Sequence, residues 1–470
     1  MISERPSGWR PGRRQSDAAR TAVFEVLTDV ETNGAYANIA LPKAIRAARL
    51  NKQDAAFATN LCYGTLRLQG RWDAILAHCM DREPEPAVRV LLRMGVHQLF
   101  ALRTPPHAAI NETVMLTRHH VGTGASGFVN AVLRQANERS LKEWQVQLKD
   151  DHGKAASTGF IADWFSHPRW IVRALSEALV AHGRERRDLI SVLKADNEPA
   201  DVALVARDIS INALRSDVGR GHMSCRPGHL VDSALILEGG DPGRVFAVRD
   251  GIAGVQDEGS QLVARTFAAA PVDGEDGAWL DMCAGPGGKT ATLVALNPAV
   301  TIFANELHEH RLDLVAENVA PWADRVQLRL GDGADIGAEQ PASFDRVLID
   351  APCTGIGALR RRPEARWVKA AGDALDLVRL QLSLLESGWE AVRPGGVVGY
   401  STCSPYLPET TGVVETFLAG REDVEVLDAR ELASSQAKLP IVGAGPYLQL
   451  WPDLHASDAM FLALLRKRAR

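Results

Sequence analysis

The 470-residue chain has no run of about 18 consecutive apolar residues, and this absence excludes a transmembrane helix. No apolar segment follows the basic stretch at residues 1–20, so we also expect no secretory signal peptide. Cysteine is scarce. Six residues scattered along the chain exclude a disulfide scaffold and suit a reducing cytoplasm, in which a thiol stays reactive.

The net charge of −5 is unpromising for a nucleic-acid-binding protein, but it hides an asymmetry. Residues 1–150 carry 20 Lys and Arg against 14 Asp and Glu, a net charge of +6, which leaves −11 for residues 151–470. A basic N-terminal third indicates a polyanionic partner, because Lys and Arg replace counterions on phosphate groups. An ordinary Arg-rich helical surface explains the same charge equally well.

Hydrophobic spacing divides the chain, whose length alone suggests about three domains. Apolar residues recur at helical spacing up to about residue 134, which predicts an all-α bundle at residues 17–142. Residues 143–250 mix a helix candidate with short strand-like runs and are expected to form a small α+β connecting domain. Strand-like runs alternate with helical stretches in residues 251–470, which predicts a mostly parallel sheet with helices on both faces. The expected disordered basic arm at residues 1–16 contains Arg5, Arg10, Arg13 and Arg14.

A glycine-rich turn between a predicted strand and a predicted helix is the most informative segment. It reads Cys283-Ala284-Gly285-Pro286-Gly287-Gly288-Lys289, and its glycines allow a tight turn and a close approach of the backbone to a ligand. A P-loop would need glycine where Cys283 stands, and the dinucleotide fingerprint would need glycine where Thr290 stands. What remains is the looser loop of nucleoside-binding α/β enzymes, which include S-adenosylmethionine enzymes.

Acidic residues follow the next two predicted strands. Glu306 lies 21 residues after Gly285, at a strand end where a carboxylate can accept hydrogen bonds from both ribose hydroxyls. Asp332 follows the third strand and could accept a hydrogen bond from an adenine amino group. Each acid alone is more simply a solvated loop residue, but their order after a glycine-rich loop favours cofactor binding.

Cysteines end two further predicted strands, in Asp350-Ala351-Pro352-Cys353 and in Thr402-Cys403. Because ligands bind at the carboxyl ends of parallel strands, both thiols should lie at the ligand edge of the sheet. A single strand-end cysteine is more simply a small buried side chain. Two of them, one preceded by Asp-Ala-Pro, favour a role in chemistry.

The chemistry that needs such a pair is methylation of a pyrimidine at C5. A thiolate adds to C6 and makes C5 nucleophilic toward a sulfonium methyl group, while a carboxyl group near N3 stabilises the developing charge. Loss of the C5 proton with elimination then frees the thiol. Enzymes that methylate amino groups need no thiol, and DNA cytosine-C5 enzymes rely on a Pro-Cys thiol alone, so the second thiol favours RNA.

At these residues the sequence closely resembles the Sun/Fmu family of bacterial RNA cytosine-C5 methyltransferases. The family's motifs stand here as the glycine-rich turn, Glu306, Asp332, residues 350–355 and Thr402-Cys403-Ser404. The resemblance implies a C-terminal Rossmann-like class I methyltransferase domain that uses S-adenosyl-L-methionine. Segments of the N-terminal third, such as residues 127–134, resemble a NusB-type RNA-binding bundle, and this fusion implies small-subunit rRNA as the substrate.

The resemblance also assigns roles to single residues. Cys403 would be the attacking nucleophile, Cys353 would assist release of the methylated product, and Asp350 would contact the target cytosine and line the methyl-transfer site. The residues that would hold the cofactor are Cys283, Ala284, Gly285, Pro286, Gly287, Gly288, Lys289, Glu306, Asp332 and Asp350.

Three positions depart from the family pattern. Gly285 stands where many members have Ala, Glu306 where many have Asp, and Ala459 where Gly is usual. The first two keep the loop geometry and the carboxylate, and the third concerns only the local backbone.

A run of arginines follows the Cys353 segment. Such a run is usually a solvated turn, but here it would place phosphate-binding charge beside the active site. A positive rim is expected there, because the target base must leave its stack to reach the thiol. The predicted RNA contacts are Arg360, Arg361, Arg362 and Arg366.

We therefore expect a cytoplasmic, monomeric RNA cytosine-C5 methyltransferase that acts on small-subunit rRNA and binds neither a membrane nor a metal. His222, Cys225 and His229 have metal-like spacing, but no fourth ligand converges there. Two alternatives stay open: the same chemistry on tRNA or another rRNA site, or a NusB-like RNA-binding factor with a vestigial catalytic domain. The intact pair of thiols argues against the second alternative.

Overall fold

The computed structural model of the chain describes residues 17–153 and 157–469. These residues form two compact units. The first holds the described residues up to Pro168 together with Arg362–Glu364, and the second holds Arg169–Arg361 and the rest of the C-terminal part. The expected basic arm at residues 1–16 lies outside the described residues.

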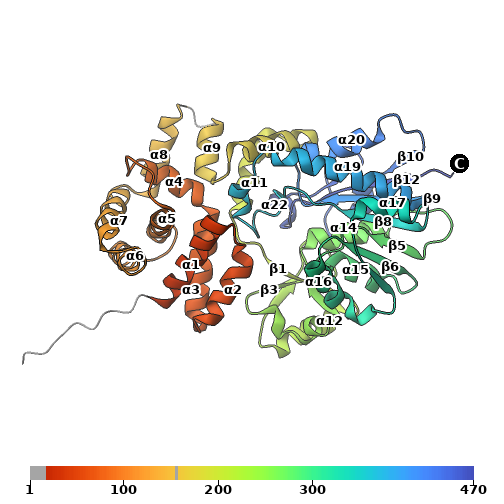
Figure 1. Cartoon of the computed structure of the whole chain (residues 1–470), viewed down its shortest axis with the longest axis horizontal. Helices are drawn as coiled ribbons and strands as arrows, with labels where there is room; N and C mark the ends of the chain where they lie inside the picture. The colour runs from red at the N-terminus through yellow and green to blue at the C-terminus, as the bar shows by residue number, and fades with distance from the viewer. Residues whose placement is uncertain (1–16, 154–156, 470) are drawn as a thin grey trace, which may run out of the picture. The chain divides into compact units, whose positions relative to one another are not determined.

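All regular secondary structure described in the first unit is helical, which confirms the predicted all-α bundle (Figure 1). The Asp17 side chain caps the first helix by accepting from two backbone N–H groups, and Gly34 ends that helix in the left-handed conformation. The helices are α1 (Ala18–Asn33), α2 (Ala37–Ala47), α3 (Lys52–Arg67), α4 (Gln69–Ala77), α5 (Pro86–Phe100), α6 (Pro106–His120), α7 (Thr123–Ala136), α8 (Leu141–Asp151) and α9 (Thr158–Phe165).

The helical unit extends past the boundary expected at residue 142. Trp144 of α8 and Phe160 of α9 are buried in the same apolar core as Trp72 of α4. The Trp144 indole N–H also donates to the Ala136 carbonyl oxygen of α7 (2.9 Å). Burial of these large aromatic side chains holds α8 and α9 to the bundle, whereas the sequence change near residue 143 suggested a new domain.

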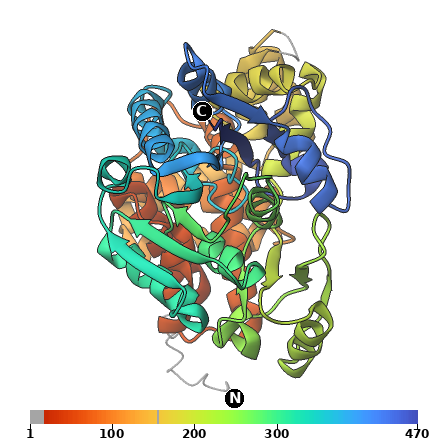
Figure 2. The same ribbon diagram turned by 90° about the vertical axis from the view of Figure 1, so that its right-hand side faces the viewer.

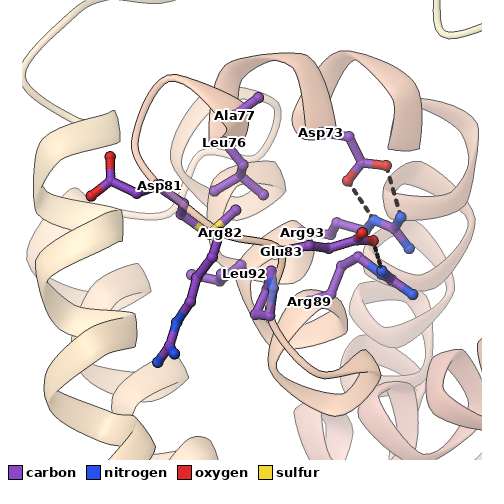
Figure 3. Close-up of a pocket in the computed structure, with 11 residues that line it drawn as sticks. Asp73, Leu76, Ala77, Asp81, Arg82, Glu83, Arg89, Leu92 and Arg93 are labelled. Atoms are coloured by element: carbon purple, nitrogen blue, oxygen red, sulfur yellow. Dashed lines mark hydrogen bonds and ion pairs between the residues drawn. The ribbon is translucent and has the colours of Figure 1, made fainter.

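An ion-pair network around the buried Arg93 lines a cavity of about 320 Å³ in the helical unit (Figure 3). The Arg93 guanidinium binds both carboxylate oxygens of Asp73 (2.7 Å each) and one oxygen of Glu31 (2.8 Å). Arg89 binds the other Glu31 oxygen (2.6 Å) and also pairs with the exposed Glu83. The charges satisfy one another, so the network stabilises the packing of α1, α4 and α5 and gives no sign of a ligand.

The second unit begins with two helices and a small antiparallel sheet. Its strand order is β2-β3-β1-β4, and apolar side chains such as Leu204 and Leu235 pack against Leu214 of the covering helix. The elements are α10 (Arg169–Ala181), α11 (Leu189–Asp196), β1 (Val202–Ala206), α12 (Ile211–Arg220), β2 (Cys225–Pro227), β3 (Ala234–Leu237), α13 (Phe246–Arg249) and β4 (Ala253–Val255).

The large sheet of the second unit has the order β10-β12-β9-β8-β5-β6-β7, with β11 paired to β12. Pairs among β5 to β9 are parallel, as predicted, whereas β10, β11 and β12 join antiparallel at one edge. The strands are β5 (Ala278–Asp281), β6 (Thr301–Glu306), β7 (Val326–Leu330), β8 (Phe344–Asp350), β9 (Val392–Thr402), β10 (Val424–Leu427), β11 (Leu448–Gln449) and β12 (Phe461–Lys467).

Helices cover both faces of this sheet, which confirms the α/β architecture (Figures 1 and 2). Successive strand residues enter opposite cores: Leu348 packs in one and Val347 in the other, as the two-residue period of a strand requires. The helices are α14 (Glu258–Ala268), α15 (Gly288–Leu296), α16 (Glu309–Val319) and α21 (Ala429–Gln436) on one face, and α17 (Ile336–Glu339), α19 (Asp373–Ala391) and α20 (Thr411–Leu418) on the other. The short helices α18 (Ala365–Val368) and α22 (Pro452–His455) lie in connecting segments.

The Arg93 network makes a direct prediction about the stability of the helical unit. Arg93→Ala should lower the free energy of local unfolding by about 3 kcal/mol, because it leaves the carboxylates of Glu31 and Asp73 without their shared cation. Hydrogen exchange of the α1 and α5 amides measures this energy. Arg82→Ala removes an exposed guanidinium from the same cavity and should change the free energy of local unfolding by less than about 0.5 kcal/mol. Equal effects of the two substitutions would contradict the assignment.

Candidate active site

The glycine-rich turn joins β5 to α15, and from β5 the chain adds β6 and β7 on one side of the sheet and then β8 and β9 on the other. Gly287 has a φ of +103°, and a Cβ added there would lie 2.9 Å from the Val315 Cα atom, so only glycine fits. The Ala284 N–H donates to the Asn305 carbonyl oxygen (2.8 Å), and the Asn305 amide donates to the Met282 carbonyl oxygen (3.0 Å). These contacts fix the turn against β6 at a switch point of the sheet, the usual ligand position in this architecture.

A cavity of about 160 Å³ opens beside this turn, and Asp281 is its most unusual polar group. One Asp281 carboxylate oxygen accepts from the Thr290 hydroxyl (2.7 Å), while Oδ1 is buried and makes no hydrogen bond of good geometry with any described residue. Burial raises the pKa of Asp281 to about 7. The remaining residues of the lining are Val255, Gln256, Ser260, Cys283, Ala284, Gly285, Pro286, Gly288, Lys289 and Asp350.

The sequence interpretation did not single out Asp281, although it stands directly before the turn. An acidic residue at the buried end of an apolar strand is the signal that could have identified it. Cys283, by contrast, was expected to hold the cofactor and does line the cavity. Burial and the neighbouring carboxylates raise the pKa of the Cys283 thiol well above its usual value, so this sulfur stays protonated.

The Glu306 carboxylate is buried at the end of β6 and is bound to the turn itself. Its Oε2 accepts from the Gly285 N–H (3.1 Å), and its Oε1 accepts from the His308 N–H (3.1 Å). Arg311 pairs with Oε2 (3.5 Å) and donates to the Gly285 carbonyl oxygen. A Cβ on Gly285 would overlap Oε2 and lie 2.9 Å from Arg311 Nε. Gly285 and Glu306, which both depart from the family pattern, therefore pack directly against each other.

Asp332 lies beyond β7, next to the strand that ends in Glu306. It is exposed, and its Oδ1 caps the short turn Gly333–Asp335 by accepting from the Ala334 N–H (2.9 Å). The structure thus places the two predicted cofactor carboxylates at the carboxyl ends of neighbouring strands.

The two strand-end cysteines meet at the same edge of the sheet. Strands β8 and β9 are parallel neighbours in which Asp350 pairs with Ser401, so their carboxyl ends are level. The Sγ atoms of Cys353 and Cys403 lie 3.4 Å apart, within sulfur hydrogen-bond distance. Both are free cysteines and are only partly buried. The spacing in the sequence predicted one shared edge, and the structure shows direct contact.

An ion pair lies beside the thiols. Lys289 Nζ donates to Asp350 Oδ2 (2.7 Å), which joins the glycine-rich turn to the end of β8. Burial disfavours the ammonium group, but the Asp350 carboxylate and the Cys403 sulfur outweigh it and raise the pKa of Lys289. Lys289 therefore remains a cation between the cofactor cavity and Cys403.

A buried carboxylate that sequence reasoning missed connects the two thiol loops. Glu409 is fully buried and accepts from the Thr354 N–H (2.7 Å), the Thr354 hydroxyl (2.5 Å) and the Ser404 hydroxyl (2.8 Å). Thr354 follows Cys353, and Ser404 follows Cys403. The only sequence signal is an acid six residues after Cys403 in the apolar context Tyr-Leu-Pro-Glu.

Comparison with known proteins identifies the family. Residues 267–466 match the family model of the 16S rRNA methyltransferase RsmB/F, and residues 17–138 match that of the NusB family. A putative methyltransferase of Mycobacterium tuberculosis is 44% identical over 98% of this chain and 99% of its own length. The ribosomal RNA small subunit methyltransferase B of Vibrio cholerae is 31% identical over 96% of this chain and 97% of its own length. The chain belongs to the RsmB/F family.

Family membership confirms the resemblance seen in the sequence and makes the protein a methyltransferase. Solved structures support the fold of this RsmB/F family member. The crystal structure of PH0851 superposes with a TM-score of 0.78 at 18% identity, covering 95% of this chain and 99% of that one. NSun6 from Pyrococcus horikoshii superposes with a TM-score of 0.53 at 17% identity, covering 63% and 98%.

Three of the four arginines that were predicted to contact RNA bind partners within the protein, and the prediction itself stays a prediction. Arg366 is fully buried and donates to the Asn197 side chain (2.7 Å). Arg360 is buried and donates to the Ala456 carbonyl oxygen (2.8 Å).

Arg361 pairs with Asp257 (2.5 Å) and Asp458 (3.0 Å). Arg362 alone is exposed, and its guanidinium carbon lies 4.5 Å from the centre of the Tyr36 ring in the helical unit. The partners of Arg360, Arg361 and Arg366 are 96 to 170 residues away in sequence, so the arginine run itself gave no sign of them.

No helix in residues 17–153 and 157–469 is long and apolar enough to span a membrane. Within the same ranges, no group of three or more His, Cys, Asp and Glu side chains is arranged to hold a metal ion.

The Gly285–Glu306 packing can be tested by a double-mutant cycle. Gly285→Ala should lower the free energy of unfolding by about 2 kcal/mol, because the new methyl group overlaps the buried carboxylate. Glu306→Asp withdraws that carboxylate by one methylene, so the double variant should recover about 1 kcal/mol of the loss. Urea unfolding of the four proteins measures the coupling. Simple additivity of the two single effects would show that the residues do not compensate each other.

Arg361→Ala distinguishes a structural arginine from an RNA contact. The substitution should lower the free energy of unfolding by about 3 kcal/mol, because it removes the cation that bridges Asp257 and Asp458. The matched control is Arg379→Ala, which breaks an exposed pair with Asp376 and should cost less than about 0.5 kcal/mol. Unchanged stability of Arg361→Ala together with weaker RNA binding would restore the original interpretation.

Proposed function

We propose that this RsmB/F protein transfers a methyl group from S-adenosyl-L-methionine to C5 of a cytosine in small-subunit rRNA through a covalent adduct between Cys403 and C6. The observation that carries the proposal is the contact between two free thiols at neighbouring strand ends, beside the Lys289–Asp350 ion pair. Methylation of an amino group would use none of this arrangement.

The cavity beside the glycine-rich turn fits the proposed cofactor. The buried Asp281 Oδ1 is a suitable acceptor for a cationic amino group, and the turn accepts no side chain at Gly287. Glu306 and Asp332, at the next two strand ends, are suited to the ribose and adenine parts. When bound there, S-adenosyl-L-methionine supplies an electrophilic methyl group on a sulfonium.

The chain's own groups then activate and release the base. The Cys403 thiolate forms a bond to C6, the C5–C6 double bond opens, and negative charge spreads toward N3. Asp350, which the ion pair with Lys289 holds in position, is the side chain assigned to contact the base there. C5 becomes a carbon nucleophile and takes up the methyl group.

Release reverses the addition. The C5 proton passes to a base, the electrons of the C5–H bond re-form the C5–C6 double bond, and the sulfur of Cys403 leaves C6 as a thiolate. The Cys353 thiol is hydrogen-bonded to Cys403 and partly buried. Both effects raise the pKa of Cys353 well above the usual thiol value, so Cys353 keeps its proton. The Cys353 S–H, 3.4 Å away, can therefore donate to the departing sulfur.

The choice of small-subunit rRNA rests on the relatives and on the helical unit. Relatives named ribosomal RNA small subunit methyltransferase B match over nearly the whole chain, and the NusB-family helices of this chain supply a domain suited to RNA. With rRNA as the substrate, we propose that the protein acts in the cytoplasm and as a monomer. Transfer RNA is the alternative substrate for the same chemistry.

Cysteine variants test the proposal directly. The wild-type protein with labelled S-adenosyl-L-methionine and unmodified small-subunit rRNA should form 5-methylcytosine at one position. Cys403→Ala should lower the rate at least about a thousandfold and form no adduct, because the nucleophile is gone. Cys353→Ala should accumulate a protein–RNA adduct on a denaturing gel, because release of the thiolate is impaired.

Cys225→Ala, which changes a partly buried thiol in the small sheet, is the control and should behave as the wild type. Adducts with Cys403→Ala rather than Cys353→Ala would mean that the two roles are exchanged. Methylation of tRNA alone would support the alternative substrate. Loss of both methylation and cofactor binding in the wild type would favour the RNA-binding factor.

A further inference from the structure

Two chemically identical thiols in contact must behave differently if one attacks and the other donates a proton. The difference has to come from their surroundings, because each thiol ends a parallel strand of the same sheet. The charges and hydrogen bonds on either side of the pair are therefore informative. This argument rests on the proposed function of the two cysteines.

Glu409 is a carboxylate beside the two thiol-bearing segments, and the methyl-transfer steps do not use it. It ends the short turn Leu407–Glu409 and is fully buried. Burying a carboxylate is costly unless donors surround it. Besides the three donors from Thr354 and Ser404, the Gln381 amide approaches Oε1 (3.3 Å), and these donors carry no formal charge. The negative charge of Glu409 is solvated by the protein and is not neutralised by a cation among them.

The hydrogen bonds of Glu409 hold both thiol-bearing segments at once. Oε2 accepts from the hydroxyls of Thr354 and Ser404, whose oxygens lie 3.2 Å from each other. The Gln381 amide also donates to the Pro352 carbonyl oxygen (2.8 Å), so the Cys353 segment is fixed on both sides. A single carboxylate thus links the segment that follows Cys353 to the segment that follows Cys403.

Charges of opposite sign flank the pair. The Glu409 charge acts on Cys353 and, with the Cys403 hydrogen bond and burial, raises the pKa of Cys353. On the other side, the Lys289 cation is the electrostatic neighbour of Cys403 and is itself held by Asp350. The other titratable group that faces Cys353 is the buried Tyr400 phenol, whose own hydroxyl donates to the Glu409 carbonyl oxygen (2.7 Å).

We propose that Glu409 is the positioning residue of the thiol pair: its carboxylate aligns the two strand ends and keeps the shared proton on Cys353. Cys403 is thereby left as the sulfur that attacks. The residue acts through Cys353 and touches neither the cofactor nor the base. An exposed acid near the thiols would neither align the strand ends nor keep the proton on Cys353, because solvent would screen its charge.

Thiol reactivity tests this proposal without RNA or cofactor. The full-length protein is treated briefly with iodoacetamide over a range of pH, and peptide mass spectrometry gives the alkylation rate of each cysteine. In the wild type, Cys403 should react faster than Cys353. Glu409→Gln should raise the Cys353 rate about tenfold at pH 8 and shift its pH profile to lower pH, because a shift of one pKa unit changes the thiolate fraction tenfold.

Glu415→Gln is the matched control, since Glu415 is exposed on the following helix α20. It should leave both alkylation rates and methylation unchanged. Thr354→Val provides a second variant that keeps the Glu409 charge and removes one hydroxyl donor. It should lower kcat for methylation about fivefold with KM unchanged and leave the pH profile of Cys353 unchanged, and it remains informative if Glu409→Gln does not fold.

The outcomes separate this proposal from the proposed function. A wild-type protein that methylates no RNA, but whose Cys353 responds to Glu409→Gln as described, would overturn the function and support the positioning role. Active wild-type protein whose Cys353 pH profile is the same in Glu409→Gln would overturn the positioning role and leave the function standing. A change in KM alone for Thr354→Val would also overturn it.

Discussion

The parallel register of β8 and β9 is the constraint on which the rest of the site depends. Asp350 pairs with Ser401, so the two strands end level and the next residues leave the sheet together. Val347 and Val398 in these strands are fully buried, and slippage by one residue would turn apolar side chains to the wrong face. The same register that protects the core therefore brings the two thiols into contact and sets Asp350 beside them.

Three buried carboxylates surround this edge, and each meets the cost of burial in a different way. Asp281 retains a proton to higher pH, since its pKa is raised to about 7. Glu306 is bound by backbone N–H groups and by Arg311. Among the described residues, Glu409 accepts hydrogen bonds from uncharged donors only. A proton-retaining acid, an acid bound by an arginine and an acid bound by uncharged donors give the cofactor cavity and the thiol pair different electrostatic surroundings within one sheet edge.

Local sequence predicted the features that depend on local chain geometry. A strand followed by glycines predicted the turn before α15, and cysteines at the ends of two apolar runs predicted a shared edge. Features that depend on distant residues were not predictable in this way. The arginine run suggested an RNA surface because its charge is visible in the sequence, whereas Asp257 and Asp458, which bind Arg361, lie 104 and 97 residues away. Glu409 was missed for the same reason, since its partner Thr354 belongs to another strand end.

The most direct test of the account is to identify which cysteine carries the RNA. Small-subunit rRNA containing 5-fluorocytidine should trap the wild-type protein, because fluorine replaces the C5 hydrogen and cannot leave as a cation, so release is blocked. Nuclease and protease digestion followed by mass spectrometry then locates the nucleotide on a peptide. The expected result is a methylated nucleotide attached to Cys403. Attachment to Cys353, or a methylated cytosine without any adduct, would contradict it.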